Sequence, residues 1–395
     1  MKIGFDISQT GRLKAGCGYF ADSLIRHLAQ VDSDNEYVLY PTFGDAYWDP
    51  EWPTATCQIN QPNFTRGLGH RTYEAAQLFW SNAPTDVEAQ LGNPDIIHAN
   101  NFFCPPGLQK ARLVYTLYDL GFLEHPEWTT EQNRIICFTG AFNASLRADC
   151  VIAISDYSRR HFLEIFPHYP SDRVVVIYPA SRFSGRSEFA QPEGLPPVHP
   201  EQFWLNVGTL EPRKNHRRLL QAYARLKAHL GQTYPLVLAG GRGWLMDDFE
   251  KSLDSLDLRQ DVILLGYVDD AALQWLYQNC FAFVYPSLFE GFGLPVLEAM
   301  GLGAAVITSN VSAIPEIVRS AGAMIDPTDE ERIFRAMLQL IEQENWRTSL
   351  RQASLARATL FSWDRAARKV LDVYAQVLSD KKYDTIPVPE ATSVA

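Results

Sequence analysis

At residues Phe281–Glu298 the chain reads FAFVYPSLFEGFGLPVLE, a stretch that predicts a strand, a loop and a helix in direct succession. The apolar and aromatic run Phe281–Tyr285 is typical of a buried strand. Pro295 favours the first turn of a following helix, where its missing N–H costs nothing. We therefore expect Glu290 in the loop after the strand and Glu298 about one turn inside the helix.

The segment between the two glutamates suits a phosphorylated sugar. The N–H groups and the positive dipole at the start of a helix favour an anion. A carboxylate on either side of that helix start can accept hydrogen bonds from sugar hydroxyls. The segment Glu290–Glu298 therefore predicts a site for a sugar, a phosphate and a second sugar in one line.

Composition places the chain among globular enzymes of two or three domains. Of its 395 residues 46% are hydrophobic and 21% charged, and the formal net charge of −11 argues against a nucleic-acid partner. The first residues, Met1–Ile7, predict a strand rather than a signal peptide, and no apolar window reaches the ~18 residues of a membrane span. The six cysteines are scattered without a C-x-x-C pair, which favours free thiols in the cytoplasm.

Strand and helix patterns alternate through both halves of the chain, which predicts an α/β protein with parallel sheets. We expect a first domain over 1–180, a linker rich in proline and glycine over 181–202, and a second domain from 203. Both are predicted to be doubly wound Rossmann-like domains facing a cleft, with ligands beyond the carboxyl ends of the strands. The composition of 386–395 predicts a disordered tail.

A second loop in the same half repeats the strand–loop–helix design. The segment GTLEPRKN, Gly208–Asn215, follows a predicted strand and opens a predicted helix. Gly208 permits a close backbone approach, and Arg213 or Lys214 can supply positive charge to a diphosphate. Alone, this segment is read more readily as a surface turn with solvated charges.

Polar candidates in the first half remain open between function and structure. The glycine-rich segment Gln9–Gly18 suits either a flexible loop or a phosphate contact, and it lacks G-x-G-x-x-G. His98 ends one strand and Tyr118-Asp119 ends another, so each is equally well a cleft residue or a structural one. Asp32-Ser33-Asp34 reads as a solvated turn rather than a metal–nucleotide site.

Taken together, these motifs resemble the retaining glycosyltransferases of family four, which have the GT-B architecture. The resemblance covers nearly the whole chain, and the spacing of E-x7-E from the lysine loop makes it specific. The mannosyltransferase-like members are the most similar in the lysine loop. The segments that carry the resemblance are Glu290–Glu298, Gly208–Asn215, Tyr285–Ser287, Ser312–Glu316, Ile325–Pro327, Ala153–Ser155, Ser158–Arg160 and Phe361–Trp363.

The resemblance implies that the second half, 203–374, binds a nucleotide-sugar donor and that the first half binds most of the acceptor. A final helix at about 375–385 would pack back on the first domain. Glu290 would contact the donor sugar and Glu298 the ribose, while Lys214 would neutralise the diphosphate. The other donor-binding residues that the resemblance implies are Gly16, Gly18, Gly208, Thr209, Gly241, Tyr267, Val268, Ser287, Phe292, Gly293 and Leu294.

Two positions depart from the family pattern. Thr209 stands where many relatives carry arginine, and Arg213 beside Lys214 is expected to replace that charge. Tyr118, followed by Asp119, stands where relatives often have histidine, so both are candidates for the acceptor side. His98 then becomes the expected catalytic histidine.

The resemblance implies transfer of a hexose with retention, by front-face attack and without a metal or other cofactor. The lysine loop favours GDP-mannose over UDP-linked sugars, and the acceptor is a glycan, a lipid-linked oligosaccharide or a small molecule. A sugar-nucleotide 2-epimerase or hydrolase, and an inactive glycosyltransferase-like subunit, remain alternatives. For peripheral membrane contact the candidates are Arg159, Arg160, Phe162 and Phe166, although an ordinary amphipathic helix explains them more readily.

Overall fold

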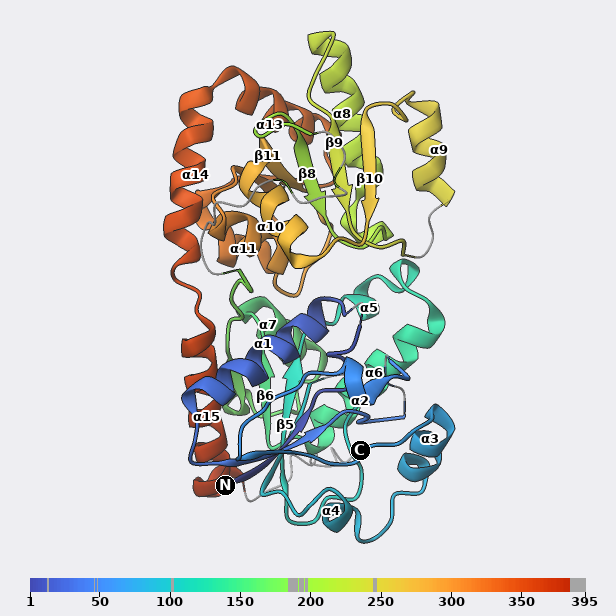
Figure 1. Ribbon diagram of the computed structural model, residues 1–395, viewed down its shortest axis with the longest axis vertical. Coiled ribbons are helices and arrows are strands. Elements are labelled where there is room, and N and C mark those ends of the chain that lie inside the picture. Colours follow the sequence, from blue (N-terminus) through green and yellow to red (C-terminus); the bar gives the residue numbers. More distant parts are fainter. Residues whose placement is uncertain are drawn as a thin grey trace, which may run out of the picture. The chain divides into compact units, whose positions relative to one another are not determined.

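The computed structural model describes residues 1–12, 14–45, 47, 49–100, 103–183, 191, 195, 198–243 and 247–383 (Figure 1). The chain divides into two compact units: unit 1 comprises Met1–Pro179 with Ser362–Ala395, and unit 2 comprises Ala180–Phe361. Much of the expected linker over 181–202, and all of the expected tail over 386–395, lie outside the described residues.

In unit 1 the described residues form a parallel sheet of seven strands in the order β3-β2-β1-β4-β5-β6-β7. The strand order reverses between β1 and β4, which are adjacent in the sheet but not consecutive in the sequence. The strands are β1 (Lys2–Asp6), β2 (Glu36–Tyr40), β3 (Phe64–Arg66), β4 (Ile96–Ala99), β5 (Arg112–Leu117), β6 (Cys150–Ala153) and β7 (Val174–Val176).

Helices cover this sheet, and the last α-helix of the described residues is one of them. The helix α15 (Trp363–Ser379) lies beside α1 (Gly16–Val31), where Phe20 and Trp363 meet edge to face at 5.5 Å (Figure 1). The whole of α15 is thus in unit 1, so the final helix begins well before the expected residue 375. The other α-helices of unit 1 are α2 (Trp52–Ala55), α3 (Tyr73–Ser81), α4 (Val87–Gln90), α5 (Gly121–Glu124), α6 (Glu131–Arg147) and α7 (Asp156–Ile165).

Unit 2 repeats the design with a six-stranded parallel sheet over its described residues, in the order β10-β9-β8-β11-β12-β13. The order reverses between β8 and β11. The strands are β8 (Trp204–Val207), β9 (Leu236–Ala239), β10 (Val262–Gly266), β11 (Ala282–Tyr285), β12 (Val306–Ser309) and β13 (Ala323–Ile325). The α-helices are α8 (His216–Leu230), α9 (Asp247–Ser255), α10 (Asp270–Asn279), α11 (Leu294–Gly301), α12 (Ile314–Val318), α13 (Glu330–Glu342) and α14 (Glu344–Ala358).

The central strands of both sheets are apolar because helices cover both faces of the sheet. In β11 every side chain is buried, as the continuous apolar run predicted. The two doubly wound parallel sheets confirm the expected α/β fold class. The short strands β3 and β13 were not expected, because three residues give too short a pattern to recognise.

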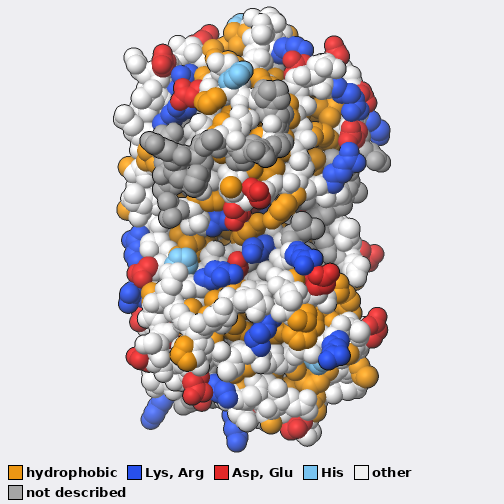
Figure 2. All heavy atoms as spheres, viewed as in Figure 1, with side chains coloured by type: hydrophobic (Ala, Val, Ile, Leu, Met, Phe, Trp, Pro, Cys, Tyr) orange, Lys and Arg blue, Asp and Glu red, His pale blue; other side chains and the backbone are white. Residues whose placement is uncertain are grey.

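The face of the molecule drawn in Figure 2 is mixed in charge. On the face drawn in Figure 2, Lys and Arg side chains alternate with Asp, Glu and apolar side chains over the described residues. Within those residues, each helix is too short or too polar to cross a bilayer.

Candidate active site in unit 2

The two loops singled out by the sequence lie at the topological switch point of unit 2. Gly208 follows β8 directly, and Ser287 follows β11 after one proline, while β8 and β11 are neighbours in the sheet. Parallel strands end at the same edge, so both loops emerge side by side. The backbone joins them, because the N–H of Leu288 donates to the carbonyl of Arg213 at 2.8 Å.

The lysine loop is held by a short 3-10 turn over Pro212–Lys214 that ends at Asn215. Asn215 has a left-handed backbone with φ 62°, a conformation that asparagine tolerates better than most residues. Its side-chain amide donates to the carbonyls of Pro286 and Pro327 at 3.0 and 2.7 Å. These bonds fix where Lys214 leaves the backbone.

Glu290 is the centre of the site. Its Oε1 accepts hydrogen bonds from Lys214 Nζ at 2.7 Å, Tyr285 Oη at 2.8 Å and Ser287 Oγ at 2.7 Å. Its Oε2 pairs with Arg213 Nη1 at 2.9 Å. The structure therefore brings together four of the predicted residues and adds Tyr285, the last residue of β11, as a further ligand of the carboxylate.

Electrostatics keep this cluster ionised. Burial alone would raise the pKa of Glu290, but Arg213, Lys214 and the hydrogen bonds outweigh it and hold the pKa at about 2. Burial and the neighbouring Arg213 lower the pKa of Lys214, against the opposite pull of Glu290 and Glu211. Glu211 also accepts from Arg213 Nη2 at 2.7 Å, so two acids and two bases share one buried network.

The loop after Glu290 turns into α11 through Gly293. This residue is the N-cap of α11, with φ 103°, and a Cβ on it would lie 2.5 Å from Ile314 Cδ1. Glycine suits this left-handed backbone, and a Cβ here would also force the end of the Ile314 side chain to move. The helix α11 begins at Leu294, and the first N–H groups of a helix are the kind of donor that binds an anion.

Glu298 lies in the middle of α11 and is 4% exposed. Its Oε2 accepts from Tyr277 Oη at 3.2 Å, and its Oε1 pairs with Arg182 Nε at 2.9 Å. Burial raises the pKa of Glu298, and the charge of Arg182 opposes that rise. Arg182 was not expected here, since nothing in the linker pattern distinguishes it from a solvated arginine.

The other predicted donor residues of unit 2 lie along the same edge of the sheet. The loops after β8, β9 and β10 are linked, because Gly208 N donates to Ala239 O at 2.9 Å and Gly240 N to Gly266 O at 2.8 Å. Thr209 is partly exposed beside Gly208, and Leu210 N donates to Gly241 O at 3.0 Å. Beyond Gly266 follow Tyr267, which is half exposed, and Val268, which is partly buried.

The predicted residues of unit 1 form a separate group at the ends of β1 and β5. The helix α1 begins at Gly16, and Tyr118 Oη donates to the carbonyl of Cys17 at 3.2 Å. A Cβ on Gly18 would lie 2.3 Å from the carbonyl oxygen of Gln9, so the start of α1 packs closely on the loop before it. Asp119 accepts from the N–H of Gly121 at 3.0 Å, which helps to start α5.

His98 is not available to a substrate. It is fully buried, with Nδ1 2.5 Å from Tyr374 Oη and Nε2 2.7 Å from Thr116 Oγ1. Burial lowers its pKa to about 3, so the ring is neutral. We therefore remove His98 from the candidate catalytic residues, because it joins β4 to α15 and β5 inside unit 1.

The aromatic residues considered for membrane contact are part of the core. Phe162 and Phe166 are buried, and Arg159 and Arg160 both pair with Asp156. These contacts favour the alternative of an ordinary amphipathic helix over membrane contact by these four residues. Exposed apolar side chains occur instead on α6, at Ile135, Phe138 and Phe142.

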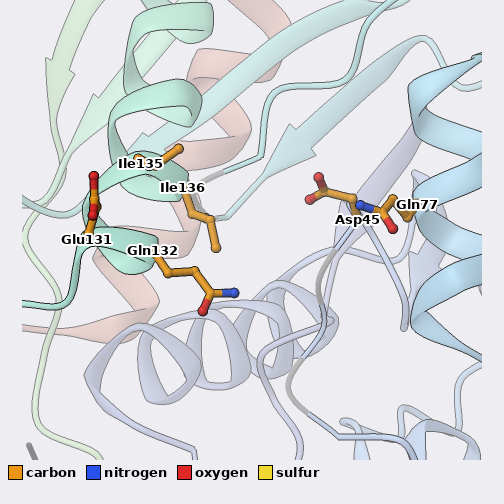
Figure 3. Close-up of a pocket in the computed structure, with 6 residues that line it drawn as sticks. All are labelled: Asp45, Gln77, Glu131, Gln132, Ile135 and Ile136. Atoms are coloured by element: carbon orange, nitrogen blue, oxygen red, sulfur yellow. The ribbon is translucent and has the colours of Figure 1, made fainter.

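A groove of about 500 Å³ lies beside α6 in unit 1 (Figure 3). In Figure 3 the side chain of Gln132 extends from the start of α6, and Asp45 and Gln77 lie across from it. Amides and carboxylates over an apolar floor are a suitable lining for sugar hydroxyls. The lining residues are Asp45, Gln77, Glu131, Gln132, Ile135 and Ile136.

No group of three His, Cys, Asp or Glu side chains that could hold a metal ion occurs within the described ranges. The positive side chains that pair with Glu290 are those of Lys214 and Arg213.

Comparison with known proteins shows the family of the chain. Residues 16–180 match the family profile described as glycosyltransferase family 4, and residues 188–357 match that described as glycosyl transferases group 1. The O-antigen chain mannosyltransferase B of Escherichia coli is 38% identical over 289 residues, which are 71% of this chain and 74% of that protein. The serotype-specific mannosyltransferase WbdA of Escherichia coli is 31% identical over 84% of this chain but only 41% of its own length.

Solved structures share the fold at low sequence identity. Sucrose-phosphate synthase from Thermosynechococcus elongatus superposes with a TM-score of 0.72 at 20% identity, covering 96% of this chain and 99% of that one. Anabaena Alr3699/HepE in complex with UDP and glucose gives a TM-score of 0.71 at 19% identity, covering 95% and 99%. The chain therefore belongs to glycosyltransferase family four and is a glycosyltransferase of the GT-B fold.

Proposed function

We propose that this glycosyltransferase transfers mannose from GDP-mannose to a hydroxyl group of a growing glycan, with retention of the anomeric configuration. The observation that carries the proposal is the buried cluster of Glu290 with Lys214 and Arg213 at the switch point of unit 2. The mannosyltransferase names of the relatives favour mannose as the donor sugar and an O-antigen-type polysaccharide as the product.

In the proposed complex, unit 2 binds the donor. Glu290 accepts hydrogen bonds from mannose hydroxyls, and the first N–H groups of α11 face the diphosphate. Lys214 and Arg213 lie next to Glu290, so they are near enough to the sugar–phosphate bond to neutralise charge on its phosphate side. Glu298, which lies further along the chain in α11, accepts hydrogen bonds from the ribose hydroxyls.

The proposed reaction is a front-face displacement. The bond between the anomeric carbon and the phosphate oxygen breaks, the acceptor oxygen bonds to that carbon from the same face, and the leaving phosphate takes the acceptor proton. Lys214 and Arg213 stabilise the charge that develops on the phosphate, which is the main catalytic contribution expected of the protein. Lys214, Arg213 and two protein hydroxyls hold Glu290 and offset its negative charge, which makes it a poor nucleophile. We propose that it accepts the mannose hydroxyls through Oε2, the oxygen that pairs with Arg213. We propose that no metal takes part.

We place the acceptor in unit 1. Tyr118 and Asp119 lie there beside the start of α1, and the groove beside α6 offers amide and carboxylate groups. A glycan on a lipid carrier would also use the exposed apolar face of α6, which gives peripheral contact with a membrane as part of the proposal.

Incubation with GDP-mannose tests this function. Transfer to a mannose-containing acceptor, with an α-linked product by NMR, is the expected result. Release of free mannose or of an epimerised nucleotide sugar without acceptor would instead support the hydrolase or epimerase alternative. A protein that binds GDP-mannose and never turns it over would be an inactive subunit.

A further inference from the structure

Arg182 connects two acidic groups of the nucleotide side of unit 2. Its Nε pairs with Glu298 Oε1 at 2.9 Å and its Nη1 with Asp270 Oδ1 at 3.1 Å. The side chain of Arg182 is 14% exposed and the side chain of Glu298 is 6% exposed, so this pair is shielded from water. The guanidinium also stands over the ring of Phe183, 4.9 Å from its centroid.

These contacts fix the arginine from several sides. Asp270 is the first residue of α10, and Tyr277 on the same helix donates to the other oxygen of Glu298. Phe183 packs edge to face against Tyr277, with centroids 6.2 Å apart. Within the part of the chain that the structure describes, the charged and titratable groups that face Glu298 are Arg182, Tyr277 and Asp270.

A carboxylate binds a diol by accepting hydrogen bonds, which it does well only when it is ionised and correctly turned. Among the described residues, each oxygen of Glu298 makes one side-chain contact, and a carboxylate oxygen has two lone pairs with which to accept. Burial works against the ionised form. Something must therefore hold the charge in place before the nucleotide arrives.

We propose that Arg182 is a positioning residue for the donor: it keeps Glu298 ionised and oriented so that Glu298 accepts the ribose hydroxyls. This inference rests on the proposed donor site, and it assigns a binding role to the segment that joins the two units. Arg182 itself does not touch the reacting atoms. Its loss acts through Glu298, since burial raises the pKa of that carboxyl and Arg182 is the largest opposing influence.

The test is calorimetric titration of the full chain with GDP, from mildly acidic to neutral pH. Arg182→Gln is expected to weaken GDP binding roughly tenfold at neutral pH, the scale of losing a charge-assisted hydrogen bond. Its binding should fail at a higher pH than in the wild type, by about one pH unit. Arg182→Lys keeps the charge and should restore most of the wild-type profile.

Two further variants separate positioning from mere packing. In Glu298→Gln the acid limb should vanish, and adding Arg182→Gln to it should cost little more, because the arginine acts through the glutamate. Arg259→Gln removes an exposed arginine of the same unit that pairs with Asp254, and GDP binding should not change.

The opposite outcomes overturn the inference. Tighter GDP binding by Arg182→Gln would mean that the arginine obstructs the ribose site, and an unchanged profile would mean that it has no role there. An equal loss at every pH would mark it as structural. Wild-type protein that binds neither GDP nor UDP would instead remove the proposed function, whatever Arg182 does.

Discussion

At the scale of single residues, replacing Lys214 gives the most direct test of the proposed site. Its Nζ lies 2.7 Å from Glu290 and 2.6 Å from Tyr285 Oη, and its position beside the sugar–phosphate bond is proposed above. Lys214→Ala should raise the barrier to transfer by about 2–4 kcal/mol, as for loss of one oxyanion-type contact. Steady-state kinetics with GDP-mannose measures this.

A surface lysine in the same unit provides the control for that variant. Lys227→Ala removes a partly exposed pair with Asp261 at 2.7 Å, away from Glu290 and Lys214 in the sequence, so turnover should stay at the wild-type level. Near-normal turnover by a folded Lys214→Ala protein would contradict the assignment of Lys214.

Glu290 makes a second prediction, about stability and pH. Its pKa is about 2 in the folded chain against an ordinary value of 4.5, so the folded state favours the ionised form. The stabilisation is therefore present above pH 4.5 and is lost as the pH falls toward 2. Glu290→Gln should lower the free energy of unfolding by a few kcal/mol at neutral pH.

Urea unfolding at several pH values measures that loss. The difference between wild type and Glu290→Gln should shrink as the pH falls below 4.5. A difference that grows in acid would mean that Glu290 is not held by the two cations in solution.

The sequence identified Glu290, Lys214 and Arg213 because each stands in a loop between a clear strand and a clear helix. It could not identify Tyr285 as a partner of Glu290, or Arg182 as a partner of Glu298, since those contacts depend on how separate segments pack. For His98 the sequence pattern was misleading for the same reason. Its place at a strand end indicated a ligand site. Only the fold reveals that its Nδ1 is hydrogen-bonded to the hydroxyl of Tyr374, 276 residues away in sequence.

At the scale of elements, the start of α11 depends on one glycine. Gly293 combines φ 103° with a neighbour, Ile314 Cδ1, that would lie 2.5 Å from a Cβ. Gly293→Ala should destabilise the chain by about 1–3 kcal/mol and also weaken GDP binding, because the N–H groups of α11 must shift. Urea unfolding and calorimetric titration with GDP measure the two effects.

Gly231, which follows α8, separates strain from position. It also has a left-handed backbone, φ 74°, but no atom lies within 4 Å of its would-be Cβ. Gly231→Ala should therefore cost only about 1 kcal/mol of stability and leave GDP binding unchanged. Equal effects of the two variants on GDP affinity would argue against a donor contact at α11.

At the scale of the whole molecule, alternation of strands and helices was sufficient to predict two parallel sheets, because that pattern has few other solutions. The limits of the units were harder to predict. The helix α15 shows the same apolar periodicity whichever sheet it packs on, so its place in unit 1 follows from contacts such as Phe20 with Trp363. Periodicity identifies a buried face but not the surface that buries it.

Ligand binding should stabilise the whole chain in a way that separates nucleotide from sugar. A ligand at a hundred times its Kd adds about 2.7 kcal/mol to the free energy of unfolding, so melting temperature reports donor choice. We expect GDP-mannose to raise the Tm more than GDP does, and GDP more than UDP. In Glu290→Gln the added effect of mannose should disappear while GDP still stabilises, because Glu290 contacts only the sugar in the proposed complex.

Glu250→Gln, which alters a partly exposed carboxylate paired with Arg242, should behave as the wild type. A larger shift with UDP-glucose than with GDP-mannose would reassign the donor, and a full mannose effect in Glu290→Gln would remove Glu290 from the sugar site.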